Sequence, residues 1–221
     1  MASQLGQDLL VLEILGGMRG GFYVDSGAAD GVIASNTLLL ESSYGWNGIC
    51  IEPDEAYFAA LVRNRRCHSL NCCLFDYDGT VDFLEAGTLG GVLCEYHPAH
   101  LEFVKNRLRL PKDPEGRPIT VKKAARTLRS VLQECGAPRI IDYWSLDTEG
   151  SELTILKSFP FDAYSFRVLT IEHNRFSVRD EIRAFLETRG YWRVRAMGID
   201  DCYVTREDLP SRSWRSSAWN R

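Results

Sequence analysis

A glycine-containing turn with an acidic residue in front of it occupies residues 25–31. Asp25 ends a short apolar run, and Gly27 and Gly31 follow it at the Asp/Glu-x-Gly-x-x-x-Gly spacing. Glycine at the first position lets the backbone pass close to a ligand, and glycine at the second allows tight contact where a helix begins. The acidic residue can hold the amine of a ligand that resembles an amino acid. We therefore expect a strand, a ligand-binding turn and a helix in this order.

The turn differs from the Gly-x-Gly-x-x-Gly pattern of a dinucleotide site, because Ala28 and Ala29 follow Gly27. A pyrophosphate group prefers more glycine, and hence more accessible backbone amides, at the start of the helix. The turn therefore favours S-adenosylmethionine (SAM) over a cofactor that contains a pyrophosphate.

A second acidic residue, Glu52, ends the next apolar run, residues 49–51. A carboxylate about 20 residues beyond the glycine turn, at the end of the adjacent parallel strand, can accept hydrogen bonds from ribose hydroxyls. Pro53 follows it and suits the first turn of a helix. The expected apolar face of that helix comprises Phe58, Leu61 and Val62.

Two later apolar runs, residues 140–146 and 166–171, are each followed by side chains that could do chemistry. Ligands of open α/β sheets bind beyond the carboxyl ends of the strands, so both groups should face the reactive end of the cofactor. The first group is Asp147 and Glu149, and the second is Glu172, His173 and Asn174.

If the ligand is SAM and the acceptor is a hydroxyl group, which must lose its proton, these side chains allow two arrangements. His173 could act as the general base, because the ordinary pKa of histidine lies near neutrality. Alternatively, Asp147 with Glu172 or Asn174 could hold Mg²⁺ or Mn²⁺ through oxygen ligands, and the cation would polarise the hydroxyl. The candidate catalytic residues are Asp147, His173 and Glu149.

The elements that must position these residues alternate between strands and helices. This order predicts an α/β protein with a Rossmann-like, doubly wound and mostly parallel seven-stranded sheet, covered by helices on both faces. Strands are expected at residues 22–24, 49–51, 69–75, 140–146, 166–171, 191–196 and 202–205.

Residues 87–120 interrupt this alternation, and we expect them to form an excursion on the substrate side with a short helix around residues 99–108. Before it, Asp78-Gly79 between two apolar runs predicts a hairpin with a type I′ turn. His97 and His100 in the excursion are expected to be solvated rather than to contact substrate. Residues 1–209 are expected to form one domain, followed by an Arg-, Trp- and Ser-rich tail at 210–221.

Composition narrows the possible partners and location. The net charge of −4 gives no broad electrostatic attraction for nucleic acid. No apolar stretch is long enough to predict a membrane span. Seven cysteines without the regular spacing of a disulfide framework predict free thiols in a reducing compartment, and therefore a cytoplasmic protein.

Several short motifs together resemble the FkbM-type methyltransferases, over almost the whole chain. Besides Val24–Gly31 and Ile51–Pro53, they include Gly45-Trp46-x-Gly48, Asp147-x-Glu-Gly-x-Glu152, Ile171-Glu-His-Asn174 and Gly190-Tyr191. One departure is Ala29, which stands where the family usually has asparagine.

The resemblance implies the class I methyltransferase fold and transfer of a methyl group from SAM to a hydroxyl of a small molecule, natural product or glycan. It implies that the cofactor is bound by Asp25, Gly27, Ala28, Asp30, Gly31, Glu52, Pro53 and Asp147. A homo-oligomer is compatible with this reading. The alternatives are an NAD(P)-binding oxidoreductase that uses the same turn, and a non-catalytic scaffold that retains the fold.

Overall fold

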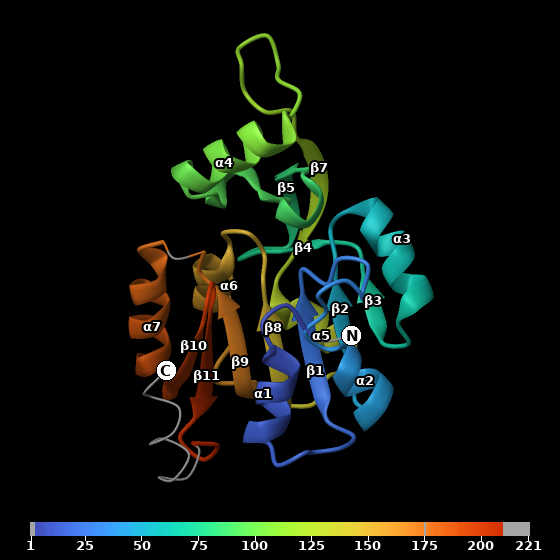
Figure 1. The fold of residues 1–221 in the computed structure, drawn as a ribbon, viewed down its shortest axis with the longest axis vertical. Coiled ribbons are helices and arrows are strands. Elements are labelled where there is room, and N and C mark those ends of the chain that lie inside the picture. The colour runs from blue at the N-terminus through green and yellow to red at the C-terminus, as the bar shows by residue number, and fades with distance from the viewer. Residues whose placement is uncertain (1–2, 175, 210–221) are drawn as a thin grey trace.

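A seven-stranded sheet forms the middle of the computed structural model, which describes residues 3–174 and 176–209 (Figure 1). Its strands are β1 (Phe22–Ser26), β2 (Asn47–Ile51), β3 (His68–Leu70), β8 (Ile140–Leu146), β9 (Ser165–Glu172), β10 (Tyr191–Met197) and β11 (Asp200–Thr205). They are ordered β10-β11-β9-β8-β1-β2-β3. Only β11 runs antiparallel to its neighbours β9 and β10. This arrangement confirms the predicted doubly wound, mostly parallel sheet.

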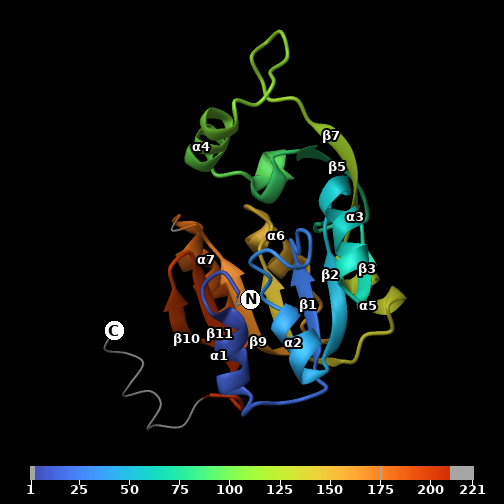
Figure 2. The ribbon, with the colours of Figure 1, turned by 45° about the vertical axis from the view of Figure 1, so that its right-hand side comes forward.

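Helices cover both faces of this sheet, as predicted (Figure 2). One face is covered by α1 (Gln7–Ile14), α2 (Leu38–Tyr44) and α3 (Glu55–Asn64), and the other by α5 (Leu128–Glu134), α6 (Glu152–Ser158) and α7 (Val178–Thr188). Side chains alternate along each strand. On β1, for example, Tyr23 packs into the first core and Val24 into the second.

A second, four-stranded sheet lies above the main one in Figure 1. Its strands are β4 (Cys73–Leu74), β5 (Gly79–Leu84), β6 (Gly91–Val92) and β7 (Val121–Arg126), in the order β4-β7-β5-β6. Helix α4 (Pro98–Leu108) and the short 3-10 turns η1 (Gly87–Leu89) and η2 (Leu93–Glu95) belong to the same part of the chain. The predicted helix of the excursion is confirmed as α4.

The strand expected at residues 69–75 is wrong, because that segment divides between the two sheets as β3 and β4. The predicted hairpin around Asp78-Gly79 is also wrong. Strand β4 pairs in parallel with β7, while β5 pairs with β7 and β6, so β4 and β5 are not neighbours.

Two predicted helix starts are wrong. No helix begins at Gly31, since α2 starts at Leu38. Helix α3 begins at Glu55, and Asp54 caps it by accepting hydrogen bonds from two backbone amides, so Pro53 lies before the cap. Val62 of this helix is exposed rather than part of its apolar face. The predicted tail at 210–221 lies outside the described residues.

Within the described part of the chain, every helix is too short or too polar to span a membrane.

Candidate active site

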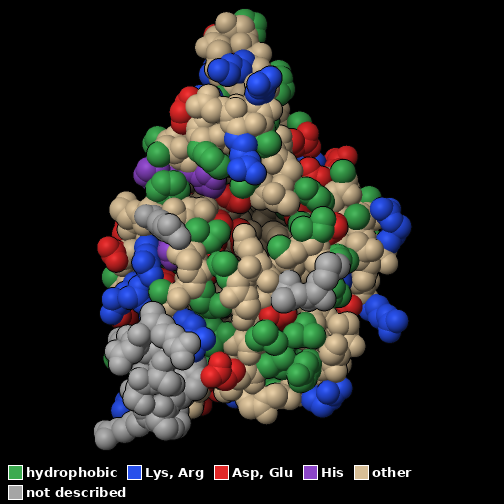
Figure 3. Space-filling view, viewed as in Figure 1, with side chains coloured by type: hydrophobic (Ala, Val, Ile, Leu, Met, Phe, Trp, Pro, Cys, Tyr) green, Lys and Arg blue, Asp and Glu red, His purple; other side chains and the backbone are tan. Residues whose placement is uncertain are grey.

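A cavity of about 310 Å³ opens at the carboxyl ends of β1, β2, β8 and β9. Residues of the turn after β1 form one wall, and residues 87–92 of the excursion form another. Figure 3 shows a hollow near the middle of the molecule with acidic side chains at its edge. Its volume lies at the lower end of the range for cavities that hold one small ligand. The sequence predicted this location from the rule for open α/β sheets.

Gly27 fits its predicted role. A Cβ atom at this position would lie 1.8 Å from the backbone oxygen of Asp147, and the residue has a φ of 82°. Glycine is therefore required for β1 and β8 to end so close together beneath the cavity. Ala28 and Ala29 line the cavity beside it. A side chain at Gly27 would separate these two strand ends, which a ligand must reach together.

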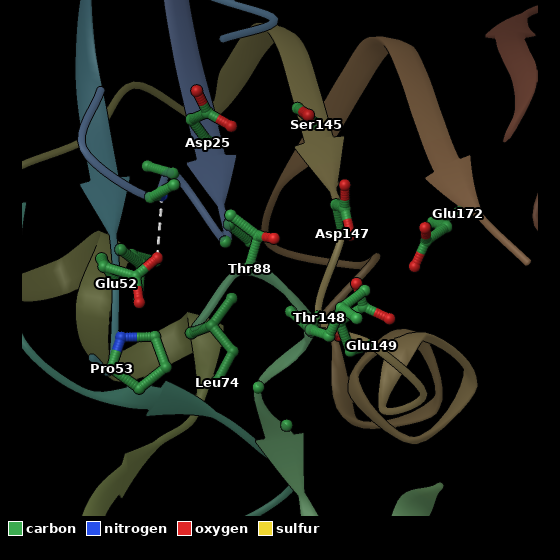
Figure 4. A pocket seen from close by; sticks show the side chains of 18 of the residues that line it. Asp25, Glu52, Pro53, Leu74, Thr88, Ser145, Asp147, Thr148, Glu149 and Glu172 are labelled. Carbon is green, nitrogen blue, oxygen red and sulfur yellow. Dashed lines mark hydrogen bonds between the residues drawn. The ribbon is translucent and has the colours of Figure 1, made fainter. Parts of the chain in front are cut away.

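Glu52 is buried next to this turn, and Figure 4 shows its hydrogen bond to the backbone of Ala29. Its two carboxylate oxygens accept hydrogen bonds from the amides of Ala29 at 2.8 Å and Asp54 at 2.7 Å. Burial raises the pKa of Glu52 to about 7, although these two hydrogen bonds oppose the shift. Each oxygen keeps a further lone pair for a ligand hydroxyl. Pro53 lines the cavity next to it.

Asp25 also lines the cavity, and its carboxylate accepts a hydrogen bond from Thr37 Oγ1 at 2.6 Å. Burial raises the pKa of Asp25, which the charge of Arg65 and the hydrogen bond from Thr37 counteract.

Two of the predicted cofactor residues, Asp30 and Gly31, do not line the cavity. Asp30 lies outside the cavity lining and accepts hydrogen bonds from the amides of Val32 and Ile33. Gly31 also lies outside it, and a Cβ atom there would meet the side chains of Leu61 and Arg65 at 2.6 to 2.7 Å. These two residues therefore shape the turn without lining the cavity.

Three carboxylates meet at the ends of β8 and β9. One oxygen from each of Asp147, Glu149 and Glu172 lies within 4.8 Å of the other two (Figure 4). Asn174 Nδ2 donates to Glu172 Oε2 at 2.8 Å and reaches Glu149 Oε2 at 3.4 Å. The structure therefore brings together the predicted members of both strand ends, with the exception of His173.

The environment of this acidic cluster disfavours full ionisation. Burial, together with the neighbouring carboxylates, raises the pKa of Asp147, Glu149 and Glu172. Among the described residues, no lysine or arginine forms a salt bridge with any of the three; His100 Nε2 lies 3.5 Å from Glu149 Oε2. Like charges this close cannot all be ionised unless a cation balances them. A sulfonium ion or a divalent metal ion would supply that charge.

The backbone around the cluster is held in an unusual conformation. Glu149 and Asn174 have positive φ angles of 60° and 48°, which non-glycine residues rarely adopt. Backbone strain of this kind is concentrated at functional sites. Glu152, which the sequence did not assign to the site, supports the turn by accepting hydrogen bonds from Thr148 and Gly150.

His173 lies away from the acidic cluster's cavity. It lines a second cavity, and its Nε2 lies 3.8 Å from Asp201 Oδ1. Burial lowers the pKa of His173. The geometry therefore separates the histidine from Asp147 rather than bringing them together.

The excursion supplies cavity residues that the sequence did not assign, notably Thr88 and the pair Gly90-Gly91. A Cβ atom on Gly91 would lie 3.2 Å from Glu149 Cβ, so glycine allows the excursion to approach the acidic cluster. In the sequence, the signal for this close approach is the pair of adjacent glycines, which stand in a segment without helical or strand periodicity.

The residues fit SAM. Gly27 lets the ends of β1 and β8 approach each other beneath the cavity, Glu52 offers carboxylate oxygens at the end of β2, and the acidic cluster offers carboxylates whose charge a sulfonium would balance. The fold places these features along one cavity.

Comparison with solved structures gives three examples of similar folds. A methyltransferase FkbM from Methylobacillus flagellatus KT is 16% identical with a TM-score of 0.49, over 84% of this chain and 43% of that one. This chain thus spans less than half of that protein's length. A putative RNA methyltransferase from Pyrococcus horikoshii is 14% identical with a TM-score of 0.43, over 91% and 82% of the two chains. The N-terminal domain of human METTL16 is 14% identical with a TM-score of 0.45, over 91% and 68%.

None of the curated proteins matches the chain. The sequence model described as "Methyltransferase FkbM domain", however, matches residues 25–192, which include the cofactor turn, Glu52 and the whole acidic cluster. The chain belongs to the FkbM family of SAM-dependent methyltransferases.

Proposed function

We propose that the protein methylates a hydroxyl group of a small molecule, natural product or glycan. The observation that supports this proposal best is the cluster of Asp147, Glu149 and Glu172 beside the cofactor turn. A hydroxyl group must lose its proton when it is methylated, and carboxylates that face the cofactor cavity can receive it. Family membership decides against the NAD(P)-binding oxidoreductase.

We assign SAM binding to Glu52, Asp25 and the turn at Gly27. Glu52 would accept hydrogen bonds from the ribose, since its oxygens already lie in the cavity wall. Asp25 would face the amino-acid part of the cofactor. Gly27 lets the ends of β1 and β8 lie close together beneath the bound ligand.

We assign proton transfer to Asp147, because it is the one carboxylate of the cluster that is partly exposed. Bound SAM supplies a positively charged sulfonium with a reactive methyl carbon, and this charge favours ionised carboxylates nearby. The hydroxyl proton of the acceptor would pass to Asp147 as the acceptor oxygen takes the methyl group that the cofactor would supply, and S-adenosylhomocysteine would leave. Holding the acceptor oxygen in line contributes much of the rate enhancement.

The same three carboxylates would hold a divalent cation, Mg²⁺ or Mn²⁺, through oxygen ligands. Such a cation would lower the pKa of the acceptor hydroxyl. Asn174 donates hydrogen bonds from Nδ2 to Glu172 and Glu149, so it would orient the metal ligands. Glu149 would then be the third ligand in place of the predicted Asn174.

The net charge of −4 supports a small-molecule or glycan acceptor over nucleic acid. A cytoplasmic location, one domain over residues 1–209 and a homo-oligomer are part of the same proposal and rest on the sequence alone.

The test uses SAM labelled with ¹³C in its methyl group and an extract of metabolites and glycans as acceptor pool. The ¹³C chemical shift of the product distinguishes a methyl group on oxygen from one on nitrogen or carbon. We expect an O-methyl product. Methylation of nitrogen alone would contradict the proposal, and SAM binding without any product would support the non-catalytic scaffold.

Replacing Asp147 tests the site itself. Asp147→Asn keeps the shape of the side chain and removes its charge, so turnover should fall about 10²-fold or more with a small change in Tm. Asp162→Asn, an exposed acid outside the cavity, is the control. Turnover of Asp147→Asn at the parent rate would remove Asp147 from the mechanism. Loss of parent activity in EDTA, restored by Mg²⁺ or Mn²⁺, would identify the cation arrangement.

A further inference from the structure

A second cavity of about 220 Å³ is lined by residues from α4, α6 and α7 and the segments before them. It contains three of the four histidines of the chain, namely His97, His100 and His173. Figure 3 shows histidine side chains, in purple, on the face of the molecule where α4 approaches α7. The proposed reaction uses none of these three side chains, so their convergence needs a different explanation.

One wall of this cavity is flat and aromatic. The ring of His97 stacks on that of Phe176, with centroids 4.0 Å apart and an interplanar angle of 10°. The ring of His100 lies 5.9 Å from Phe176. Phe176 is half-buried and His97 is exposed, so the stacked pair borders the cavity without being sealed inside the protein. Such a surface can pack against the apolar face of a ring.

The edge of the second cavity is polar and offers both hydrogen-bond donors and hydrogen-bond acceptors. Glu95 and Glu181 bring carboxylate oxygens, which accept hydrogen bonds. His97 Nδ1 accepts from the amide of Ala99, so a neutral His97 keeps Nε2–H as a donor. Hydroxyl groups both donate and accept, and therefore complement this edge.

The second cavity adjoins the cofactor cavity at the acidic cluster. Asn174 lines both cavities. His100, which lines the second, places Nε2 3.5 Å from Oε2 of Glu149, which lines the first. A ligand in the second cavity therefore lies next to the acidic cluster, from which His100 and Asn174 separate it.

The volume of the first cavity indicates that the cofactor and the acceptor would occupy different cavities. The first has a volume suited to one small molecule, which the cofactor itself would fill. An acceptor must then approach the methyl group from outside that volume, on the side of the acidic cluster.

We propose that the second cavity is the acceptor site, and that it binds a ring with an apolar face and hydroxyl groups at its edge. The apolar face packs on His97 and Phe176, and one hydroxyl points past His100 to the acidic cluster. A sugar ring and a phenolic ring share this chemistry. This inference rests on the proposed function, whose cluster it places at the meeting point of cofactor and acceptor.

The four histidines allow a direct test. Protein with ¹³C-labelled histidine gives one imidazole signal for each, and His68 on the exposed edge strand β3 is an internal control. Methyl β-glucoside and catechol are titrated separately, to millimolar concentration, into protein saturated with S-adenosylhomocysteine. We expect at least one probe to shift the signals of His97 and His100 and to leave that of His68 unchanged. The probe that does so distinguishes a sugar from a phenol.

Two variants locate the binding surface. Phe176→Leu keeps an apolar side chain but loses the flat ring, and should weaken binding of the probe about two- to tenfold. His97→Asn retains a side chain that can cap α4 and should weaken binding similarly. Tyr77→Leu, an exposed aromatic residue outside both cavities, should leave binding unchanged.

The proposal is overturned if neither probe shifts His97 or His100, or if the probe binds Phe176→Leu and His97→Asn as tightly as the parent. Because the readout is binding to protein loaded with S-adenosylhomocysteine, this failure differs from failure of the proposed function. The latter would appear as absent cofactor binding or absent O-methyl product.

Discussion

Glu52 illustrates how burial changes a single carboxyl group beside the cofactor turn. Its pKa rises from 4.5 to about 7 because the folded protein removes water from it. Between these two values the folded protein retains a proton that the unfolded chain has released, so this group's contribution to folding stability decreases as pH rises through that window. Binding of a ribose hydroxyl has the opposite dependence, because the ionised carboxylate is the stronger acceptor.

We therefore expect SAM to bind more tightly one pH unit above 7 than one unit below it. Glu52→Gln should remove this pH dependence and weaken binding about ten- to a hundredfold, since a charge-assisted hydrogen-bond pair is lost. Isothermal titration calorimetry at both pH values measures the effect. Equal affinity of parent and variant at the higher pH would show that Glu52 does not hold the ribose.

Ala29 shows the effect of backbone conformation at the same turn. Its φ of 46° lies in the left-handed region, where alanine is strained and asparagine is tolerated. Ala29→Asn should raise the free energy of unfolding by about 0.5–1 kcal/mol and leave SAM affinity unchanged or higher. Thermal denaturation with and without SAM measures both quantities. A lower Tm would show that the asparagine side chain does not fit the cavity wall.

The sequence predicted that a helix would follow the turn at residues 25–31. In the structure a buried arginine just after α3, Arg65, holds this turn instead. Arg65 donates hydrogen bonds of 2.8–3.2 Å to five groups, and its side chain is fully buried. The acceptors are Tyr23, Gly31, Ser35, Thr37 and Glu41. Thr37 in turn donates to Asp25, so the network reaches the cofactor cavity.

Arg65→Met should destabilise the protein by about 3–5 kcal/mol, because it removes the ion-pair partner of Glu41 and the buried hydrogen bonds that Arg65 donates. It should also weaken SAM binding at a temperature where the variant remains folded, since the turn loses its anchor. Arg63→Met, an exposed position at the end of α3, is the matched control. Unchanged SAM affinity in folded Arg65→Met would limit this residue to a role in stability.

The main sheet could be predicted because its strands are continuous apolar runs or alternate in polarity, and turns separate them. The strands Cys73–Leu74 and Gly91–Val92 of the small sheet are too short to show any period, so their pairing could not be predicted. On β10, a register shift between Arg193 and Arg195 buries Tyr191 and Val194 and exposes Trp192, which breaks simple alternation.

The same limit applies to the site. Asp147, Glu149 and Glu172 could be predicted, because the ends of parallel strands meet at one edge of a sheet. The contact of His100 with Glu149 could not be predicted, because it depends on the position of the excursion at residues 87–120, and the sequence did not predict how that segment folds. His173 directly follows Glu172 of the acidic cluster in sequence, yet it lines the other cavity, as successive residues at a strand end face opposite ways.

The loop at residues 111–118 projects away from both sheets (Figure 2). Its residues are mostly exposed and line neither cavity. Replacing residues 112–118 with a short glycine-containing turn should change neither SAM affinity nor Tm by more than the effect of an exposed substitution. Calorimetry and thermal denaturation test this. A marked loss of SAM affinity would show that the loop acts on the cofactor site.

The strands through which the chain enters and leaves the small sheet are paired side by side, with Cys73 opposite Ala125 and Leu74 opposite Arg126. A segment whose two ends are fixed next to each other can be lengthened at an entropic cost that grows only with the logarithm of its length. The segment between residues 75 and 124 can therefore change in length at little cost in stability, provided that residues 87–92 keep their place in the wall of the cofactor cavity. If the second cavity binds the acceptor, length changes in this segment would alter the wall formed by His97 and His100 without changing the main sheet.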